Sequence, residues 1–292
     1  MNDLNHQTSR TATLLMHCPD QQGVVAAVSE YIRKNNGTIL HLDEHVDLET
    51  KTCFMRLLWD LETFNLHADA IRKDFEDAVA KPYHMNWEIN FSDEKTRMAI
   101  FVSKESHCLY DILARWQTEE FQVEIPLIIS NHPNLQAIAN KFGIDFYLFP
   151  IMPENKKYQE TKQMELLEQH RIDFIVLARY MRILSQAFIA KYPHRIVNIH
   201  HAFMPTFPGA KPYYAAYERG VKLIGATSHF VTGNLDAGPI IEQDVVRINH
   251  ADNIPDMVRK GRDLEKTVLS HTISLYLERK ILVYDNRTIV FP

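Results

Sequence analysis

Three polar side chains in the second half of the chain have the types needed to act on one carbonyl carbon. Asn198 and His200 lie two residues apart at the end of an apolar run, so in an extended strand both side chains point to the same side. Asp236 lies downstream, before Ala-Gly-Pro, which is typical of a tight turn. An amide donor, an imidazole that titrates near neutral pH and a carboxylate suit proton transfer and oxyanion stabilisation. Asn198, His200 and Asp236 are therefore candidate residues of a functional site.

Each of these residues also has a simpler interpretation. A histidine at a strand end is more often a hydrogen-bonded structural group than a catalyst, and Asp236 on its own is most simply a turn residue. His194, His200 and His201 together suggest a metal site, but their spacing fits no familiar zinc site and no carboxylate pattern completes it. We therefore expect no metal.

The glycines direct attention to the same region. The chain has 9 glycines, and Gly209, Gly220, Gly225, Gly233 and Gly238 fall within one short stretch. Glycine marks places where the backbone turns sharply or approaches another group closely. Residues 198–240 are thus the expected location of the site, with a rigid loop at Pro205, Pro208 and Gly209.

Composition and charge restrict the class of protein. The chain has 292 residues, 46% hydrophobic and 24% charged, which is typical of a globular protein of about two domains. No run approaches the ~18 apolar residues of a membrane span, and the polar N-terminus does not resemble a secretory signal. Three widely spaced cysteines favour a reducing cytoplasm. A net charge of −5 with no long basic run argues against nucleic acid and membrane partners.

The hydrophobic pattern divides the chain into two expected domains. Residues 8–91 have the order βαββαβ, which predicts two helices on one face of an antiparallel sheet, with the apolar residues Leu40, Leu42, Val46 and Leu48 on one side of a strand. Residues 92–97 are charged and form the expected linker. From 98 to 292, short apolar strands alternate with helices, which predicts a doubly wound, mostly parallel sheet. A ligand then binds at the carboxyl ends of the strands.

Four segments together resemble the formyltransferase family that uses 10-formyltetrahydrofolate. They are Asn198-Ile199-His200, the following Pro-Gly loop, 227–232 (TSHFVT) with 235–241 (LDAGPII), and 177–184 (LARYMRIL). The resemblance covers about residues 98–285 and implies a catalytic domain of formyltransferase type. It implies catalytic roles for Asn198, His200 and Asp236 and supporting roles for Thr227 and His229, although His229 is equally well explained as a structural histidine.

The resemblance also implies a pocket for the folate. An apolar slot lined by backbone amides and carbonyls suits a flat pterin with donors and acceptors along its edge. The expected folate-binding residues are Met181, Arg182, Ile183, Leu184, Phe230, Val231, Thr232 and Leu235. Arg182 is expected either to bind the carboxylate of the glutamate tail or to be a solvated surface charge.

The acceptor of the formyl group is expected to be water. A nucleotide acceptor needs a glycine-rich loop for its phosphate, whereas residues 103–107 (SKESH) contain no glycine, and Glu105 would repel a phosphate that Lys104 only partly attracts. The resemblance is greatest to the hydrolytic branch of the family, since His201 stands where the transferases usually have proline. It implies hydrolysis of 10-formyltetrahydrofolate to tetrahydrofolate and formate without a cofactor, with formate supplied for purine synthesis. Transfer to an amine and a non-catalytic folate or amino-acid sensor remain alternatives.

Residues 11–91 resemble an ACT domain, a ferredoxin-like module that the hydrolytic members carry ahead of the catalytic part. ACT domains bind small effectors, often amino acids, between copies, so the resemblance implies a homo-oligomer, a dimer or a tetramer. The segment Asp20-Gln21-Gln22-Gly23 precedes a helix and is a candidate anchor for the carboxylate of an effector. A pure oligomerisation module is the alternative.

Overall fold

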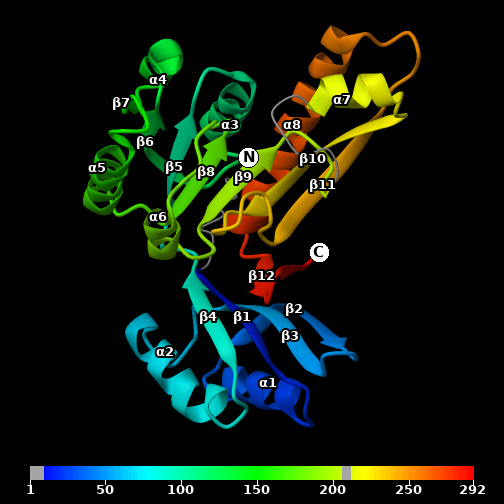
Figure 1. Cartoon of the computed structure of the whole chain (residues 1–292). Coiled ribbons are helices and arrows are strands. Elements are labelled where there is room, and N and C mark those ends of the chain that lie inside the picture. The colour runs from blue at the N-terminus through cyan, green and yellow to red at the C-terminus, as the bar shows by residue number, and fades with distance from the viewer. Residues whose placement is uncertain (1–9, 206–211) are drawn as a thin grey trace, which may run out of the picture. The chain divides into compact units, whose positions relative to one another are not determined.

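The computed structural model describes residues 10–205 and 212–292, and it divides the chain into two compact units (Figure 1). The first unit reaches Lys95 and includes Arg279–Leu282 and Ile289–Pro292, while the second contains Thr96–Glu278 and Val283–Thr288. The second unit therefore differs from the expected 98–292 domain in its C-terminal tail. Residues 8 and 9 of the expected first domain lie outside the described residues, as do Pro208 and Gly209.

The first unit is a four-stranded antiparallel sheet with two helices. The strands are β1 (Thr11–Pro19), β2 (Thr38–Asp47), β3 (Thr52–Asp60) and β4 (Asn86–Phe91), in the order β2-β3-β1-β4. The helices are α1 (Val24–Lys34) and α2 (Ala68–Phe75), which continues as a π-helical turn, η1 (Glu76–Ala80). Alternate residues of β1, from Ala12 to Cys18, share one core with both helices. The predicted βαββαβ order is confirmed.

Strand β2 departs from the predicted alternation. Leu42 and Val46 pack against the core, but Leu40 is 51% exposed and Leu48 is 83% exposed. The pairing of β2 with β3 shifts between Ile39 and His41, so Leu40 is the extra residue of a bulge. A bulge changes the face to which the following side chains point. Leu48 lies beyond the end of the strand. The inward positions expected for Leu40 and Leu48 are therefore wrong.

The second unit contains a seven-stranded sheet in the order β11-β10-β9-β8-β5-β6-β7. Five strands are parallel, and β10 and β11 are antiparallel to their neighbours. The strands are β5 (Arg97–Val102), β6 (Glu124–Ser130), β7 (Asp145–Leu148), β8 (Phe174–Ala178), β9 (Ile196–His200), β10 (Leu223–Phe230) and β11 (Ile240–Arg247). The predicted, mostly parallel, doubly wound sheet is confirmed. The strand order reverses between β5 and β8, and the cleft for a ligand is expected there.

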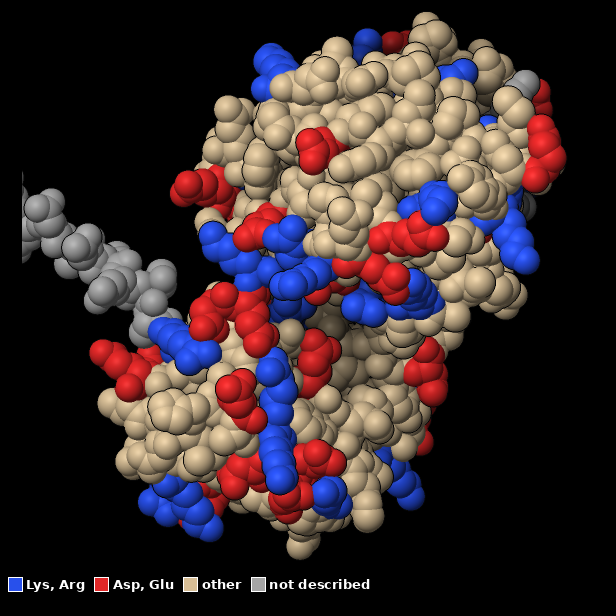
Figure 2. Space-filling model, turned by 90° about the vertical axis from the view of Figure 1, so that its left-hand side faces the viewer, with Lys and Arg blue, Asp and Glu red and all other residues tan. Residues whose placement is uncertain are grey.

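Helices surround this sheet (Figure 1). They are α3 (His107–Gln117), the short 3-10 turn η2 (Pro133–Leu135), α4 (Gln136–Lys141), α5 (Lys156–Gln169), α6 (Gln186–Lys191), α7 (Pro212–Arg219) and α8 (Ile254–Leu277). Strands β12 (Ile281–Tyr284) and β13 (Arg287–Val290) form the predicted C-terminal hairpin. Helix α7 was not predicted. Acidic and basic side chains are interspersed on the face shown in Figure 2. Among the described residues, no helix has both the length and the apolar character needed to cross a membrane.

Candidate active site

A cavity of about 410 Å³ lies at the carboxyl ends of β8 and β9. Its walls come from the loop after β8, from the end of β9 and from the turn between β10 and β11. Asn198, His200 and Asp236 all line it. Met181, at the beginning of one wall, is held by a hydrogen bond from its backbone N–H to Oγ of the buried Ser103, which follows β5. The cavity therefore lies where the fold predicts a ligand, beside the reversal of the strand order.

Asp236 brings two histidines together. Its Oδ2 is 3.4 Å from Nδ1 of His200, and its Oδ1 is 3.6 Å from Nε2 of His229. His200 comes from β9 and His229 from β10, whose antiparallel register pairs His229 with Asn198. The side chains of Asn198, His200 and Asp236 therefore converge, as the sequence analysis expected.

Asn198 is oriented by His229. Its Nδ2 is 3.3 Å from Nε2 of His229, while Nδ1 of His229 is 2.9 Å from the carbonyl oxygen of Phe230. Because a carbonyl oxygen only accepts, Nδ1 of His229 carries a hydrogen, and in this tautomer Nε2 accepts from the amide of Asn198. The amide nitrogen of Asn198 has a second hydrogen, which remains for a ligand in the cavity.

Burial controls the charge of His200. Desolvation lowers the pKa of His200 below its usual value of 6.5, and Asp236 opposes this shift only in part. The neighbouring His229 and His200 rings lower the pKa of Asp236, which is therefore ionised at neutral pH. A carboxylate beside an imidazole ordinarily favours the charged ring, but desolvation of the His200 ring outweighs this attraction. His200 rests as a neutral base.

The turn that presents Asp236 needs an unusual backbone. Asp236 has φ 50°, in the left-handed region, which aspartate tolerates better than most residues. At Gly238 a Cβ atom would lie 1.8 Å from the carbonyl oxygen of Phe230, so only glycine fits. The amide of Asn286 donates a hydrogen bond of 3.1 Å to the carbonyl of Ala237. These contacts fix the carboxylate opposite the histidines.

Thr227 fixes the segment that follows His200. It is fully buried, and its hydroxyl donates to the carbonyl of Ala202 at 2.9 Å. The same oxygen accepts from the backbone N–H of Met204 and from the side chain of Gln243, each at 3.0 Å. Thr227 does not line the cavity but holds the segment that follows His200, and its supporting role stays a prediction.

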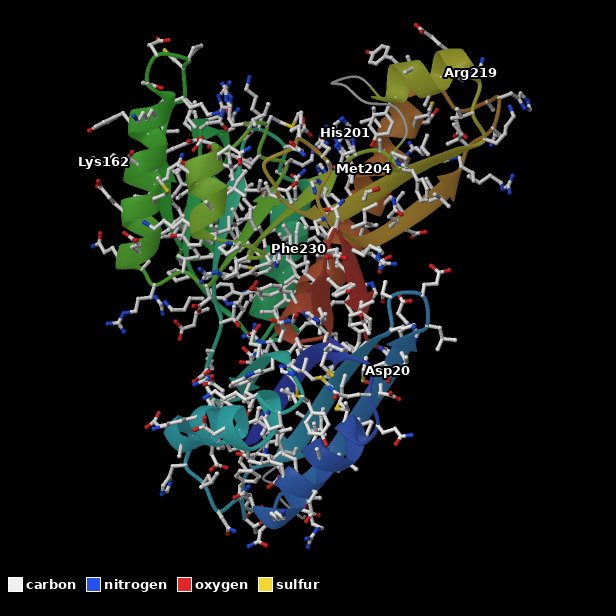
Figure 3. All side chains as sticks on the ribbon, turned by 60° about the horizontal axis from the view of Figure 1, so that its bottom comes forward. Asp20, Lys162, His201, Met204, Arg219 and Phe230 are labelled. Atoms are coloured by element: carbon white, nitrogen blue, oxygen red, sulfur yellow. The ribbon has the colours of Figure 1, made fainter. Side chains whose placement is uncertain are left out.

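Most of the expected folate-binding residues line the cavity, and one does not. Those lining it are Met181, Arg182, Ile183, Leu184, Val231, Thr232 and Leu235. Phe230 is 2% exposed, and its ring lies 6.5 Å from that of Tyr276 of α8 in the core (Figure 3). Neighbouring residues of a strand point to opposite faces, so Phe230 points away when His229 points in. The placement of Phe230 in the pocket is corrected.

The sequence analysis missed several lining residues. Of these, Arg179 has φ 63°, and its Nε and Nη1 are buried without a hydrogen-bond partner among the described residues. It lies within the LARYMRIL segment, where a long charged side chain next to two apolar strand residues was the available signal. His201 also lines the cavity. Burial, reinforced by the charge of Arg179, lowers the pKa of His201 to about 4, so the ring is neutral at pH 7.

The candidate effector segment lies at the beginning of α1. Gly23 is the N-cap of α1, with φ 89° and no side-chain cap, so the first N–H groups of the helix have no side-chain acceptor there. Gln21 donates to the carbonyl of Tyr83 at 3.1 Å, and Asp20 and Gln22 are exposed. The carboxylate of Asp20 opposes an anionic ligand at this end, so the anchor role of Asp20–Gly23 stays a prediction.

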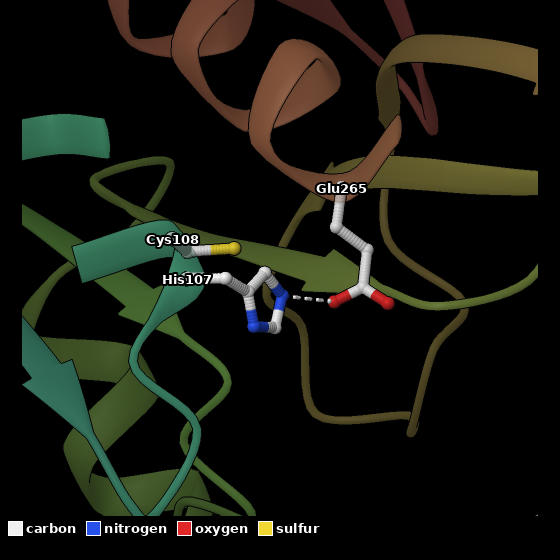
Figure 4. A group of neighbouring side chains, drawn as sticks. All are labelled: His107, Cys108 and Glu265. Atoms are coloured by element: carbon white, nitrogen blue, oxygen red, sulfur yellow. Dashed lines mark hydrogen bonds and ion pairs between the residues drawn. The ribbon is translucent and has the colours of Figure 1, made fainter. Parts of the chain in front are cut away.

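A second group of titratable side chains lies between α3 and α8. His107, Cys108 and Glu265 have potential ligand atoms within 4.8 Å of one another, and Nε2 of His107 is 2.8 Å from Oε2 of Glu265 (Figure 4). Burial raises the pKa of the Cys108 thiol, and a metal ligand must be a thiolate. Nε of Arg179 lies 3.5 Å from the same Oε2, where its charge opposes a cation. We therefore interpret the group as an ion-pair cluster, and the expectation of no metal stays a prediction.

Known proteins are similar to this chain over most of its length. Residues 96–273 match the family model described as formyl transferase. A formyltetrahydrofolate deformylase of Synechocystis is 52% identical over 96% of this chain and 98% of its own length. The crystal structure of a formyltetrahydrofolate deformylase from Pseudomonas syringae superposes with a TM-score of 0.96, at 44% identity, and covers 99% of this chain and 97% of that one.

A transformylase superposes on a smaller part of this chain. The glycinamide ribonucleotide transformylase 1 of Symbiobacterium toebii superposes with a TM-score of 0.64 at 27% identity. The superposition covers 69% of this chain and 97% of that one. The same fold thus occurs in proteins whose names indicate different acceptors of the formyl group.

Proposed function

This chain belongs to the formyl transferase family and, within it, to the formyltetrahydrofolate deformylases, and from that premise we propose how its cavity hydrolyses 10-formyltetrahydrofolate to tetrahydrofolate and formate. The observation that carries the proposal is the convergence of Asn198, His200 and Asp236 on one cavity. It combines a base, an oxyanion donor and an ionised carboxylate in the arrangement that acyl transfer to water requires.

His200 acts as the base that activates water. Its Nδ1 faces the ionised Asp236, so Nδ1 keeps the proton and Nε2 is the nitrogen left to accept one. As the water oxygen attacks the formyl carbon, Nε2 takes a proton from the water. The carboxylate stabilises the imidazolium that forms.

Asn198 stabilises the intermediate. Attack on the formyl group converts its carbonyl oxygen to an oxyanion, and the free N–H of Asn198 donates to that oxygen. The bond between the formyl carbon and N10 then breaks. N10 receives the proton held by His200, which gives tetrahydrofolate, while the remaining proton of formic acid goes to solvent. The reaction as proposed uses no metal and no cofactor besides the folate substrate.

The folate lies across the apolar part of the cavity. Exposed Met181, Ile183 and Leu235 form the apolar rim that closes on the pterin, and the backbone of the segment after β8 supplies donors and acceptors to its edge. Arg182 is exposed at the rim, a position from which it binds the carboxylate of the glutamate tail.

The first unit is proposed to mediate self-association and to bind an amino-acid effector. Ile39, Leu40 and Leu48 are exposed apolar residues on or next to β2, which is an edge strand. A second copy covering that edge would bury them. Sedimentation analysis at several concentrations tests the assembly: a dimer or tetramer that Leu40→Lys dissociates supports it, and a monomer at every concentration contradicts it.

We further propose that the enzyme acts in the cytoplasm and that its formate serves purine synthesis.

The proposed activity is tested by incubating the full chain with 10-formyltetrahydrofolate in a buffer without amines. Equal amounts of formate and tetrahydrofolate are expected, with repeated turnover. Negligible formate until an amine is added would indicate a transferase instead. Binding of the folate without conversion under either condition would indicate a sensor.

A further inference from the structure

Two cavities of the second unit meet at one buried carboxylate. The proposed active-site cavity is lined by Arg179, and a second cavity of about 670 Å³ is lined by His107. Oε2 of Glu265 is 3.5 Å from Nε of Arg179 and 2.8 Å from Nε2 of His107. Glu265 is 1% exposed and lies on α8. Arg179, Glu265 and His107, which we call the charged partition, therefore separate the two cavities.

The charged partition is held by further contacts on α8. The hydroxyl of Tyr213 donates to Oε1 of Glu265 at 3.0 Å. Gly261 lies one turn before Glu265, and a Cβ atom there would come within 2.0 Å of the Tyr213 hydroxyl. The ring of His201, which lines the active-site cavity, lies 6.0 Å from that of Tyr213. Because residue 261 is glycine, the Tyr213 hydroxyl has the space to reach and hold the Glu265 carboxylate. The charged partition is therefore a fixed structure and not a mobile surface charge.

Arg179 is the member of the charged partition that lines the active-site cavity, together with Asn198, His200 and Asp236. Its charge also lowers the pKa of both His200 and His201. Two of its buried nitrogens lack a hydrogen-bond partner among the described residues. The side chain therefore fills part of the wall of the cavity that His200 also lines.

We propose that the charged partition makes this enzyme a hydrolase, because the Arg179 side chain closes the approach through which an acceptor larger than water would reach the formyl carbon. The inference rests on the proposed function and specifies its acceptor. The second cavity, beyond Glu265, offers the volume that such an acceptor would need. Its cations do not make it an anion site, because Arg259, Arg262 and Lys266 are paired with Asp256, Glu105 and Asp263.

The pairing of Glu105 changes the earlier argument about the acceptor. Glu105 was expected to repel a phosphate, but its carboxylate lies 2.5 Å from Nη2 of Arg262 and is neutralised there. Repulsion by Glu105 therefore does not explain the choice of water. We assign the exclusion of larger acceptors to Arg179 instead, which lies on the active-site side of Glu265.

Opening the charged partition admits an amine in place of water. In the altered reaction the amine nitrogen attacks the formyl carbon, and the bond from that carbon to N10 breaks. The proton lost by the amine passes through His200 to N10, so the products are an N-formyl amine and tetrahydrofolate. The probe is glycinamide, a small primary amine, with 10-formyltetrahydrofolate that carries a ¹³C label in its formyl group.

The test compares Arg179→Gly with wild type and with Arg171→Gly. Arg171 is an exposed arginine with φ 50°, so its replacement matches the chemistry and backbone conformation of the Arg179 change at a distance from the active-site cavity. The ratio of N-formylglycinamide to formate is measured by NMR. Arg179→Gly is expected to raise this ratio about tenfold or more, and Arg171→Gly is expected to leave it at the wild-type value. An unchanged ratio in a folded Arg179→Gly protein would overturn the inference.

A second variant controls for the destabilising effect of the buried Glu265 carboxylate, which Arg179→Gly leaves without its arginine. Arg179→Gly combined with Glu265→Gln removes both charges, and a glutamine keeps hydrogen bonds to Tyr213 and His107. It is expected to give the same rise in ratio.

A third measurement uses wild type alone: hydroxylamine, which is close to water in size, should be formylated in preference to glycinamide. Equal use of the two amines, corrected for their reactivity without enzyme, would contradict the partition.

Failure of this inference and failure of the proposed function give different results. Formate release by wild type without amines tests the function alone. The dependence of the product ratio on Arg179 tests the partition alone. Loss of the Arg179 charge should also move the acid limb of the pH profile upward, because that charge lowers the pKa of His200. A purely structural role of Arg179 would not move it.

Discussion

Oδ2 of Asp236 lies 3.4 Å from Nδ1 of His200, although the two residues belong to different segments of the chain. A left-handed backbone conformation at Asp236 and a glycine that no other residue can replace hold the carboxylate in this place. The relationship decides which nitrogen of His200 is available for the reaction. Replacing the carboxylate therefore affects catalysis more than folate binding.

The first prediction concerns Asp236→Asn. Asparagine tolerates the same backbone conformation, so the turn is kept while the negative charge is lost. We expect kcat to fall by about 10²–10⁴-fold, the range for general acid–base groups, with the Kd for the folate within a few-fold of wild type. Stopped-flow or steady-state formate assays with fluorescence titration measure both. A kcat near wild type would remove Asp236 from the mechanism.

The second prediction concerns the oxyanion donor. Asn198→Ala removes the free N–H that faces the cavity, and loss of one such donor typically costs about 10²–10³-fold in kcat. Asn198→Asp is the matched control, because it keeps the shape of the side chain but presents a carboxylate to the oxyanion. It should be at least as impaired as Asn198→Ala. Activity of the aspartate variant close to wild type would show that Asn198 donates nothing to the intermediate.

The third prediction is the pH dependence of kcat/KM. Burial lowers the pKa of His200 below 6.5, and the neutral ring is the active form. Activity should therefore stay constant as the pH falls to 6.5 and decline only below it. Asp236→Asn removes the group that raises the pKa of His200, so its residual activity should decline at still lower pH. An acid limb centred above pH 6.5 in wild type would be inconsistent with a desolvated base.

The fourth prediction concerns stability. The pKa of His201 is lowered from 6.5 to about 4 by burial, so below pH 6.5 the unfolded chain takes up a proton that the folded chain does not. The free energy of unfolding should fall between pH 6.5 and pH 4, with about 3 kcal/mol of this loss due to His201. His201→Phe should reduce the loss in urea denaturation curves, whereas the exposed His250→Phe should not. Equal pH dependence in both variants would refute the assignment.

Much of the fold could be predicted because its strands and helices have strong hydrophobic periods. The five parallel strands are continuous apolar runs, and the N-terminal helices repeat their apolar residues on one face. The features that could not be predicted are those in which the structure departs from this hydrophobic periodicity. The bulge at Leu40 reverses the alternation of β2 without any change in composition. Helix α7 begins at Pro212, shortly after the residues expected to form only a loop.

The site was predicted in part for a similar reason. Spacing alone places Asn198 and His200 on one side of a strand, but it cannot bring Asp236 to them. That contact depends on the antiparallel register of β9 and β10 and on the turn that follows. Phe230 was wrongly placed because all residues at the end of the 227–232 motif were expected to line the folate pocket. Neighbouring residues of a strand point to opposite faces, so not all of them can. Arg179 was missed because its partner, Glu265, is distant in sequence.

The central claim is that water is the acceptor of the formyl group at Asn198, His200 and Asp236, and isotope incorporation tests it most directly. The full chain is incubated with 10-formyltetrahydrofolate in H₂¹⁸O without amines, and the formate is analysed by mass spectrometry at early time points. The account predicts one ¹⁸O atom in each formate released, with labelled formate formed about 10²–10⁴-fold more slowly by Asp236→Asn than by wild type. Formate without ¹⁸O, or labelled formate formed equally fast by Asp236→Asn, would contradict it.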